Sequence, residues 1–186
     1  MLLTVVLAGA LTLAGCGAAP WVRAGSASPT PTATKTAQPE VHSDLAKGSL
    51  KRQLTAGGAT LDVTYWSTLK PTQWTAAVDK PLFVSFVATA GSTVYASNVV
   101  MTANAYRGSK QVSTKPISIT DNATVQPGYT VSSPYSYTGL FTLPAVPSTA
   151  TSVRVSFTYV LLQAVEPNGG LAKSTTADTL TIAIAP

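Results

Sequence analysis

The sequence of 186 residues has almost none of the side chains on which most catalytic and metal sites depend. It contains one cysteine, Cys16, and one histidine, His42, so an internal disulfide is impossible. Beyond residue 42 there is no histidine to act as the base that serine and cysteine nucleophiles need. The ligands that zinc prefers are missing there too. These shortages argue against an enzyme, and no metal or cofactor site is predicted.

Charge is also scarce, at 10% of residues against roughly 25% in typical soluble domains. The net charge is +5, but the longest basic run is Lys51-Arg52, whereas nucleic-acid-binding proteins cluster Lys and Arg on one face. Binding of nucleic acid is therefore not expected. The carboxylates beyond residue 48 are scattered and show no local pair of the kind that glycoside hydrolysis uses: Asp62, Asp79, Asp121, Glu166 and Asp178.

Long apolar runs are limited to the N-terminal end. Residues 1–14 carry no charge and are rich in Leu, Val and Ala, as in the apolar core of a secretory signal. As a helix this segment would reach only about 20–25 Å, which is shorter than the ~30 Å hydrocarbon core of a bilayer. It is therefore a poor permanent transmembrane helix. Two small residues, Ala14 and Gly15, then lead to Cys16.

The sequence Leu13-Ala14-Gly15-Cys16 resembles the lipobox of bacterial lipoproteins. The resemblance implies that residues 1–15 are a signal peptide, that Cys16 is lipidated on its sulfur, and that the lipid anchors the protein to the extracytoplasmic face of the bacterial cell membrane. The composition, rich in Ala and Thr and poor in Lys, resembles that of uncharacterised lipoproteins of high-GC Gram-positive bacteria. Signals normally begin with a basic residue, and none precedes Arg23, so we expect the translation start to lie upstream of Met1.

Residues 16–47 are predicted to form a disordered tether that begins at the lipidated cysteine. Prolines at positions 20, 29, 31 and 39 alternate with Ser, Thr, Ala and Gly, and no apolar periodicity is available for burial. His42, near the end of this segment, is expected to lie in an exposed polar patch and not in a metal site.

From residue 48 to residue 186 the periodicity becomes that of strands. Leu61, Val63 and Tyr65 alternate with polar residues, and the turn at Gly57-Gly58 predicts a hairpin with the preceding segment. Pro116 predicts an edge strand or a switch between sheets. Residues 166–178 are expected to form a loop. The predicted strands are 49–55, 60–66, 81–88, 99–107, 112–120, 135–143, 152–165 and 179–185.

These strands, with no helix longer than a turn, predict an all-β fold. We expect an immunoglobulin-like antiparallel β-sandwich of about 7–8 strands, because two amphipathic sheets must cover each other's apolar faces. A small β-barrel is the alternative. The residues expected to be most deeply buried are Leu61, Val63, Val84, Phe86, Val153, Val155, Phe157, Leu180 and Ile182.

The aromatic residues are the one group of side chains that suggests a binding surface. Trp66 and Trp74 bracket the segment 67–73, and Tyr129, Tyr135 and Tyr137 gather in a second region rich in Ser and Pro. Exposed rings stack on sugars and anchor protein interfaces. The alternative is that Tyr65 belongs to the core and the two tryptophans pack over the end of a sheet.

Together these patterns predict a membrane-anchored cell-surface lipoprotein whose β-sandwich is non-enzymatic and serves binding or envelope structure. One alternative is a carbohydrate-binding module for the cell wall. Another is an accessory partner or sensor of an envelope enzyme. The expected partners are the membrane, through the lipid anchor, and either a protein or a cell-wall polysaccharide.

Replacement of Cys16 tests the anchor directly. Cys16→Ser removes the sulfur that would carry the lipid, so the variant is expected to leave the membrane fraction for the medium, or to remain as unprocessed precursor. Cell fractionation with immunoblotting measures both outcomes. An unchanged partition into the membrane fraction would refute lipid anchoring at this residue.

Overall fold

The computed structural model describes residues 41–165 and 169–186, which form ten β-strands and one short 3-10 helix. Cys16, the predicted signal peptide and most of the predicted tether lie outside the described residues. The elements in chain order are β1 (Ser49–Ala56), β2 (Ala59–Trp66), η1 (Pro71–Gln73), β3 (Lys80–Thr89), β4 (Val94–Arg107), β5 (Lys110–Gln111), β6 (Ile117–Asn122), β7 (Tyr129–Thr130), β8 (Tyr137–Leu143), β9 (Ser152–Val165) and β10 (Gly170–Ala183).

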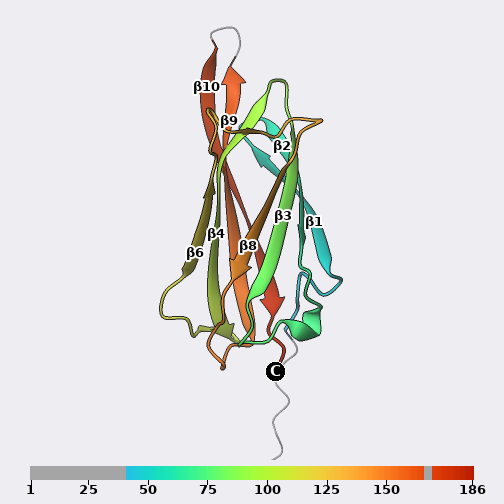
Figure 1. The fold of residues 1–186 in the computed structure, drawn as a ribbon, viewed down its shortest axis with the longest axis vertical. Helices are drawn as coiled ribbons and strands as arrows, with labels where there is room; N and C mark the ends of the chain where they lie inside the picture. Colours follow the sequence, from blue (N-terminus) through green and yellow to red (C-terminus); the bar gives the residue numbers. More distant parts are fainter. Residues whose placement is uncertain (1–40, 166–168) are drawn as a thin grey trace, which may run out of the picture. The chain divides into compact units, whose positions relative to one another are not determined.

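The strands form two antiparallel sheets (Figure 1). The first has the order β1-β2-β3-β8. The second has the order β10-β9-β4, and β5, β6 and β7 pair one after another with the free edge of β4. Among the described residues, no named strand of one sheet pairs with a named strand of the other, although an isolated bridge joins Ala88 of β3 to Ser132, just after β7. The two sheets therefore form a sandwich-like arrangement. The neighbours β3 and β8, facing β4, β9 and β10, follow the B-E and C-F-G arrangement of immunoglobulin domains.

Local sequence explains the β1–β2 hairpin. Gly57 and Gly58 both have positive φ, at 58° and 83°, which a two-residue hairpin turn requires and glycine adopts at little cost. The turn sets the register that pairs Ala56 with Ala59. It thereby directs the alternating apolar residues of β2 toward the second sheet.

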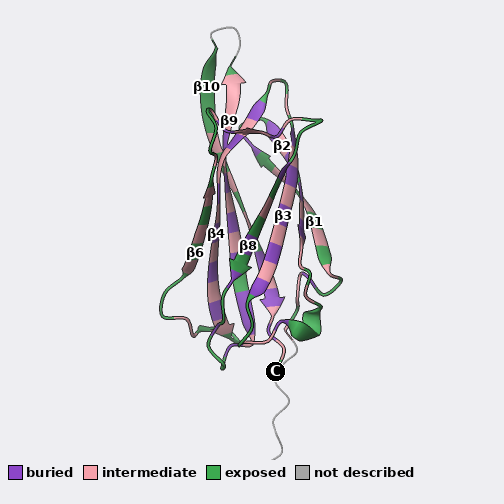
Figure 2. Ribbon diagram, viewed as in Figure 1, coloured by how far each residue is buried: buried purple, intermediate pink, exposed green. Residues whose placement is uncertain are grey.

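The core lies between the two sheets and is centred on aromatic rings. Figure 2 shows buried and less buried residues alternating along β3, β4 and β9, as expected for strands with one inward face. All nine residues predicted to be most deeply buried are at most 2% exposed. Phe157 of the second sheet lies 5.4 Å from Tyr65 and 5.3 Å from Phe141 of the first, measured between ring centroids.

A β-bulge explains why β4 begins earlier than the predicted strand at residue 99. The pairing of β4 with β9 shifts between Ala96 and Asn98, which leaves Ser97 as an extra residue. Val94 and Ala96 are buried before the bulge, and Val99 and Met101 after it. The inward-facing residues are therefore even-numbered before Ser97 and odd-numbered after it. A single period-2 pattern does not fit both parts, so the sequence predicts only the second part of the strand.

The last strand corrects the prediction of a loop over residues 166–178, since β10 begins at Gly170. Residues 170–178 pair with β9, from Gly170↔Val165 to Asp178↔Phe157. Residues 170–173 are nevertheless exposed. The β9–β10 hairpin extends past the neighbouring strands in Figure 1. Backbone pairing holds this part of the strand without burial, so no apolar alternation marks it.

The packed domain also includes some of the residues 16–47 that the sequence predicts as tether. Leu45 is only 4% exposed, and the backbone N–H of Asp44 donates to the carbonyl of Thr181 at 2.8 Å. A carboxylate oxygen of Asp44 accepts from the N–H of Thr181 at 2.7 Å. This pairing with the free edge of β10 begins before residue 48. The side chain of His42 is 85% exposed, as predicted.

Truncation of Phe157 tests the core. Phe157→Ala is expected to lower the free energy of unfolding by about 3–5 kcal/mol, because it leaves a cavity among packed rings. Denaturant unfolding measures this loss. Leu140→Ala is the matched control, since Leu140 is 54% exposed and its truncation should change stability by only about 0.5 kcal/mol. A loss below about 1 kcal/mol for Phe157→Ala would contradict its central position.

Candidate functional site

The structure does not gather the predicted aromatic residues into one exposed surface. Trp74 is 2% exposed and Tyr137 is 5% exposed, so neither can serve as the exposed ring that the prediction required. Trp66 and Tyr129 are half-buried, and Tyr135 is 62% exposed. Of the five, only Tyr129 and Tyr137 are neighbours, with ring centroids 6.3 Å apart.

Trp74 fills the core at one end of the sandwich, as the alternative reading expected. It follows η1, and its backbone carbonyl accepts a hydrogen bond from the N–H of Ala185 at 2.9 Å. Tyr65 is fully buried, which also agrees with that reading. Trp66 differs, because it lies on the outer face of the first sheet.

Tyr137 joins the two sheets at one of their open sides. Its hydroxyl donates to Asp121 of β6 at 2.6 Å, so a strand of each sheet contributes one partner. The ring lies over Gly139, where an added Cβ would collide with the Tyr137 hydroxyl. Burial raises the pKa of Tyr137 far above its ordinary value, and the nearby Asp121 carboxylate raises it further. This pair is a structural contact rather than a reactive one.

A second polar contact joins the sheets at the opposite side. The guanidinium of Arg52 on β1 donates to the carboxylate of Asp178 on β10 and, at 3.2 Å, to that of Asp44. In the core beside this ion pair, the hydroxyl of Tyr159 donates to that of Tyr65 at 2.9 Å. Burial raises the pKa of both tyrosines far above the ordinary value. Both hydroxyls therefore remain protonated and neutral inside the protein.

Lys80 is the one fully buried charged side chain among the described residues. Its ammonium donates to the carbonyl of Val78 at 2.6 Å and approaches that of Ala76 at 3.5 Å. Burial lowers the pKa of Lys80, and the neighbouring Asp79 opposes that shift only in part. Since Lys80 has no exposed surface and holds the chain before β3, its role is to fix that segment.

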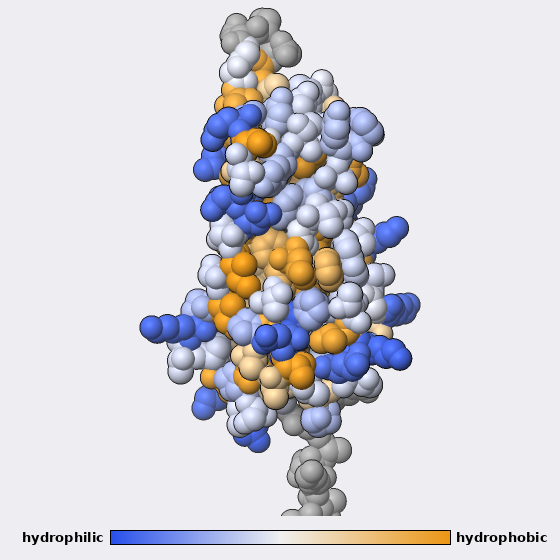
Figure 3. All heavy atoms as spheres, viewed as in Figure 1, coloured by the Kyte–Doolittle hydropathy of each residue, from blue (hydrophilic) through white to orange (hydrophobic). Residues whose placement is uncertain are grey.

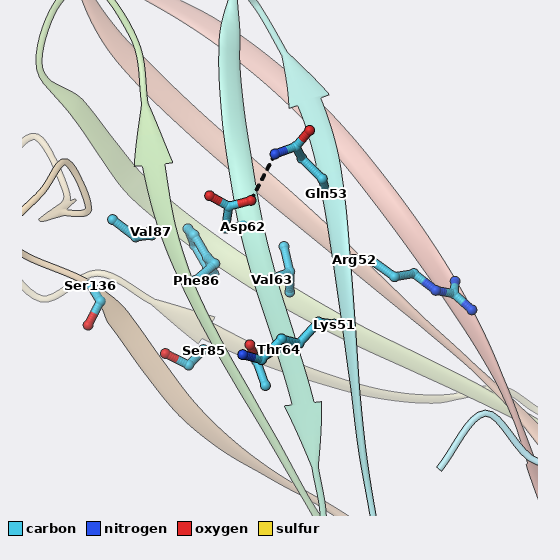
Figure 4. A pocket seen from close by; sticks show the side chains of 10 residues that line it. All are labelled: Lys51, Arg52, Gln53, Asp62, Val63, Thr64, Ser85, Phe86, Val87 and Ser136. Atoms are coloured by element: carbon cyan, nitrogen blue, oxygen red, sulfur yellow. Dashed lines mark hydrogen bonds between the residues drawn. The ribbon is translucent and has the colours of Figure 1, made fainter. Parts of the chain in front are cut away.

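The outer face of the β1-β2-β3-β8 sheet carries a groove. It has a volume of about 560 Å³. Figure 4 shows its lining residues on β1, β2 and β3, together with Ser136 just before β8, and the hydrogen bond of 2.9 Å that Gln53 donates to Asp62. We call this the outer-face groove. Its lining residues are Lys51, Arg52, Gln53, Asp62, Val63, Thr64, Ser85, Phe86, Val87 and Ser136.

An apolar row crosses the same face beside the outer-face groove. Strand register places Trp66 opposite Phe83, and Phe83 opposite Leu140. The rings of Trp66 and Phe83 are stacked, with centroids 5.2 Å apart and planes 9° apart. Leu140 is 54% exposed. In Figure 3, apolar atoms gather near the middle of the viewed face, over β3 and β8.

Sequence reasoning identified only Trp66 in this row. Phe83 and Leu140 were not predicted as site residues, because strand register across three strands cannot be read from one segment. A usable signal was present in β3, where both faces carry apolar side chains: Leu82, Val84 and Phe86 inward, Phe83 and Val87 outward.

Within residues 41–165 and 169–186, no three His, Cys, Asp or Glu side chains lie close enough together to hold a metal ion. In the same part of the chain, no helix has the length and apolar character needed to cross a membrane.

No protein-family model matches this chain, and no curated protein sequence matches it either. A solved structure with some likeness is the crystal structure of a Bordetella pertussis protein described as ApaA. The two chains share 13% sequence identity, the match covers 69% of this chain and 94% of that one, and the TM-score is 0.38. The likeness says nothing about the function of this chain.

The buried tyrosines predict a specific loss of stability in alkali. Tyr65, Tyr137 and Tyr159 have raised pKa values in the folded protein, so their stabilising effect is complete below the unfolded value of about 10 and declines as the pH rises above it. Above pH ~10, each of these three tyrosines should lower the free energy of unfolding by about 1.4 kcal/mol per pH unit.

Denaturant unfolding at several pH values measures this slope. Tyr159→Phe removes one titrating hydroxyl, so above pH ~10 its slope should be shallower by about 1.4 kcal/mol per pH unit. Below pH ~9 the variant and the wild type should have the same slope, which serves as the internal control. Equal slopes above pH ~10 would contradict a buried, neutral Tyr159.

Proposed function

We propose that the chain is a membrane-anchored cell-surface lipoprotein whose β-sandwich is a non-enzymatic binding domain. The observation that carries the binding role is the outer-face groove with the apolar row of Trp66, Phe83 and Leu140 beside it. The lipobox-like sequence ending at Cys16 supports the anchor. In this proposal the β-sandwich provides a rigid binding surface, and the lipid anchor holds the domain at the cell membrane.

The groove suits binding because its outward-facing side chains come from paired strands, with Ser136 before β8 as the exception. Lys51, Thr64 and Ser85 lie opposite one another on β1, β2 and β3. Ladder hydrogen bonds fix these strands, so little conformational freedom is lost when a ligand is bound. A volume of about 560 Å³ lies within the usual range of ligand pockets.

The anchor suits a domain that works close to the membrane. In the lipoproteins that this sequence resembles, the modified cysteine carries several acyl chains. One chain gives only marginal membrane binding, whereas two signals together give stable attachment. The polar, proline-rich segment after Cys16 would act as a spacer between the anchor and the domain.

Site-directed photo-crosslinking in cells tests the binding face. A photoreactive amino acid in place of Lys51, which is exposed at the outer-face groove, is expected to form an adduct with an envelope component. The same group in place of Lys173, which is exposed on β10 of the other sheet, is the matched control and should not. Adducts at both positions, or at neither, would contradict binding at this face.

A further inference from the structure

We infer that the outer-face groove and the apolar row together bind a neutral polysaccharide chain. This inference rests on the proposed binding function and names its ligand class. It depends on three features of the outer face of the first sheet: the order of its side chains, its balance of charge and the free face of one indole ring.

Strand register arranges these side chains in three successive rows. The first row is Ser49, Trp66, Phe83 and Leu140; the second is Lys51, Thr64, Ser85 and Thr138; the third is Gln53, Asp62 and Val87. Rows two residues apart are separated by roughly 7 Å, so the three rows span roughly 13 Å. That length suits several linked sugar rings better than a single small molecule.

The middle and third rows offer hydrogen-bonding groups without net charge. Lys51 contributes one positive charge and Asp62 one negative charge, while the Gln53 amide both donates and accepts. Hydroxyls on Thr64, Ser85 and Thr138 continue the row. Sugar hydroxyls are both donors and acceptors, so a mixed surface of this kind matches them.

The charge balance disfavours an anionic ligand at this face. Arg52, the other cation at the groove, points away from it in Figure 4 and binds the carboxylates of Asp178 and Asp44. Lys51 is therefore the one cation of the groove lining that lacks such an ion pair. Phosphate-bearing polymers and lipid headgroups are bound by clusters of cations, which the described part of this face does not have.

The apolar row provides a surface on which a sugar ring can stack. One face of the Trp66 indole is covered by Phe83. The opposite neighbour across the strands is Ser49, an exposed residue whose side chain is too short to cover an indole. Register thus places no bulky side chain opposite that face, and the polar row of Lys51 and Thr64 is the next row along the strands, so one ligand chain on this face can contact the ring and the polar groups together.

Binding of the full chain to insoluble polysaccharides tests the inference. The probes are cellulose, chitin, insoluble mannan and granular starch as neutral polymers, with calcium-crosslinked polygalacturonate as the anionic comparison. We expect at least one neutral polymer to retain the protein in a depletion isotherm. Trp66→Ala should weaken that retention roughly tenfold.

Two further variants keep the result interpretable. Asp62→Ala changes an exposed groove side chain outside the core and should also weaken retention, even if Trp66→Ala proves unstable. Tyr106→Ala is the matched control, because Tyr106 is a half-buried ring that contacts Arg154 at 4.4 Å on the outer face of the other sheet. Circular dichroism establishes that each variant is folded.

Several outcomes would overturn the inference. They are retention on no neutral polymer, retention on polygalacturonate alone, or equal retention of Trp66→Ala, Asp62→Ala and Tyr106→Ala. A protein adduct from the Lys51 crosslinker, with no polymer retained, would reject the polysaccharide and leave the proposed binding function standing. Failure of both the crosslinking and the polymer experiments would reject both.

Discussion

The burial of two apolar sheet faces against each other is the constraint on which the rest of this structure depends. Aromatic rings from both sheets meet at its centre, where Phe157 contacts Tyr65 and Phe141. Among these rings, the hydroxyl of Tyr159 on the second sheet donates to that of Tyr65 on the first. Because a buried hydroxyl without a partner would be costly, this pair fixes how the two sheets align as well as helping to hold them together.

Side-chain contacts link the two sheets at the open sides of the sandwich, and the backbone of Val131 adds hydrogen bonds to β3 and to β4. Arg52 and Asp178 link β1 to β10, and Tyr137 and Asp121 link β8 to β6. Both contacts are part-buried, where a hydrogen bond to a charged group contributes more than it does in open water. The outer faces are therefore free of any role in joining the sheets, and the outer face of the first sheet can carry the groove and the apolar row.

The small net charge of the chain can be interpreted once the charged side chains are assigned to the faces of the two sheets. The net charge of +5 would suggest attraction to anionic polymers if it were concentrated. At the groove, however, Arg52 is neutralised by two carboxylates, and Lys51 lies on a face shared with Asp62. Together with the stacked rings of Trp66 and Phe83, this distribution supports a neutral, hydroxyl-rich ligand more strongly than composition alone could.

Local patterns in the sequence determined the fold class, because alternation and turn chemistry act over a few residues. The parity of Leu61, Val63 and Tyr65 decided which face of β2 is buried, and Gly57-Gly58 decided the hairpin register. Tertiary structure alone decided that Trp74 fills the core, that β10 continues through residues expected to form a loop, and that Phe83 and Leu140 join Trp66 in one row. Each of these depends on which distant strand lies alongside, and pairing between distant segments leaves no periodic trace in either segment by itself.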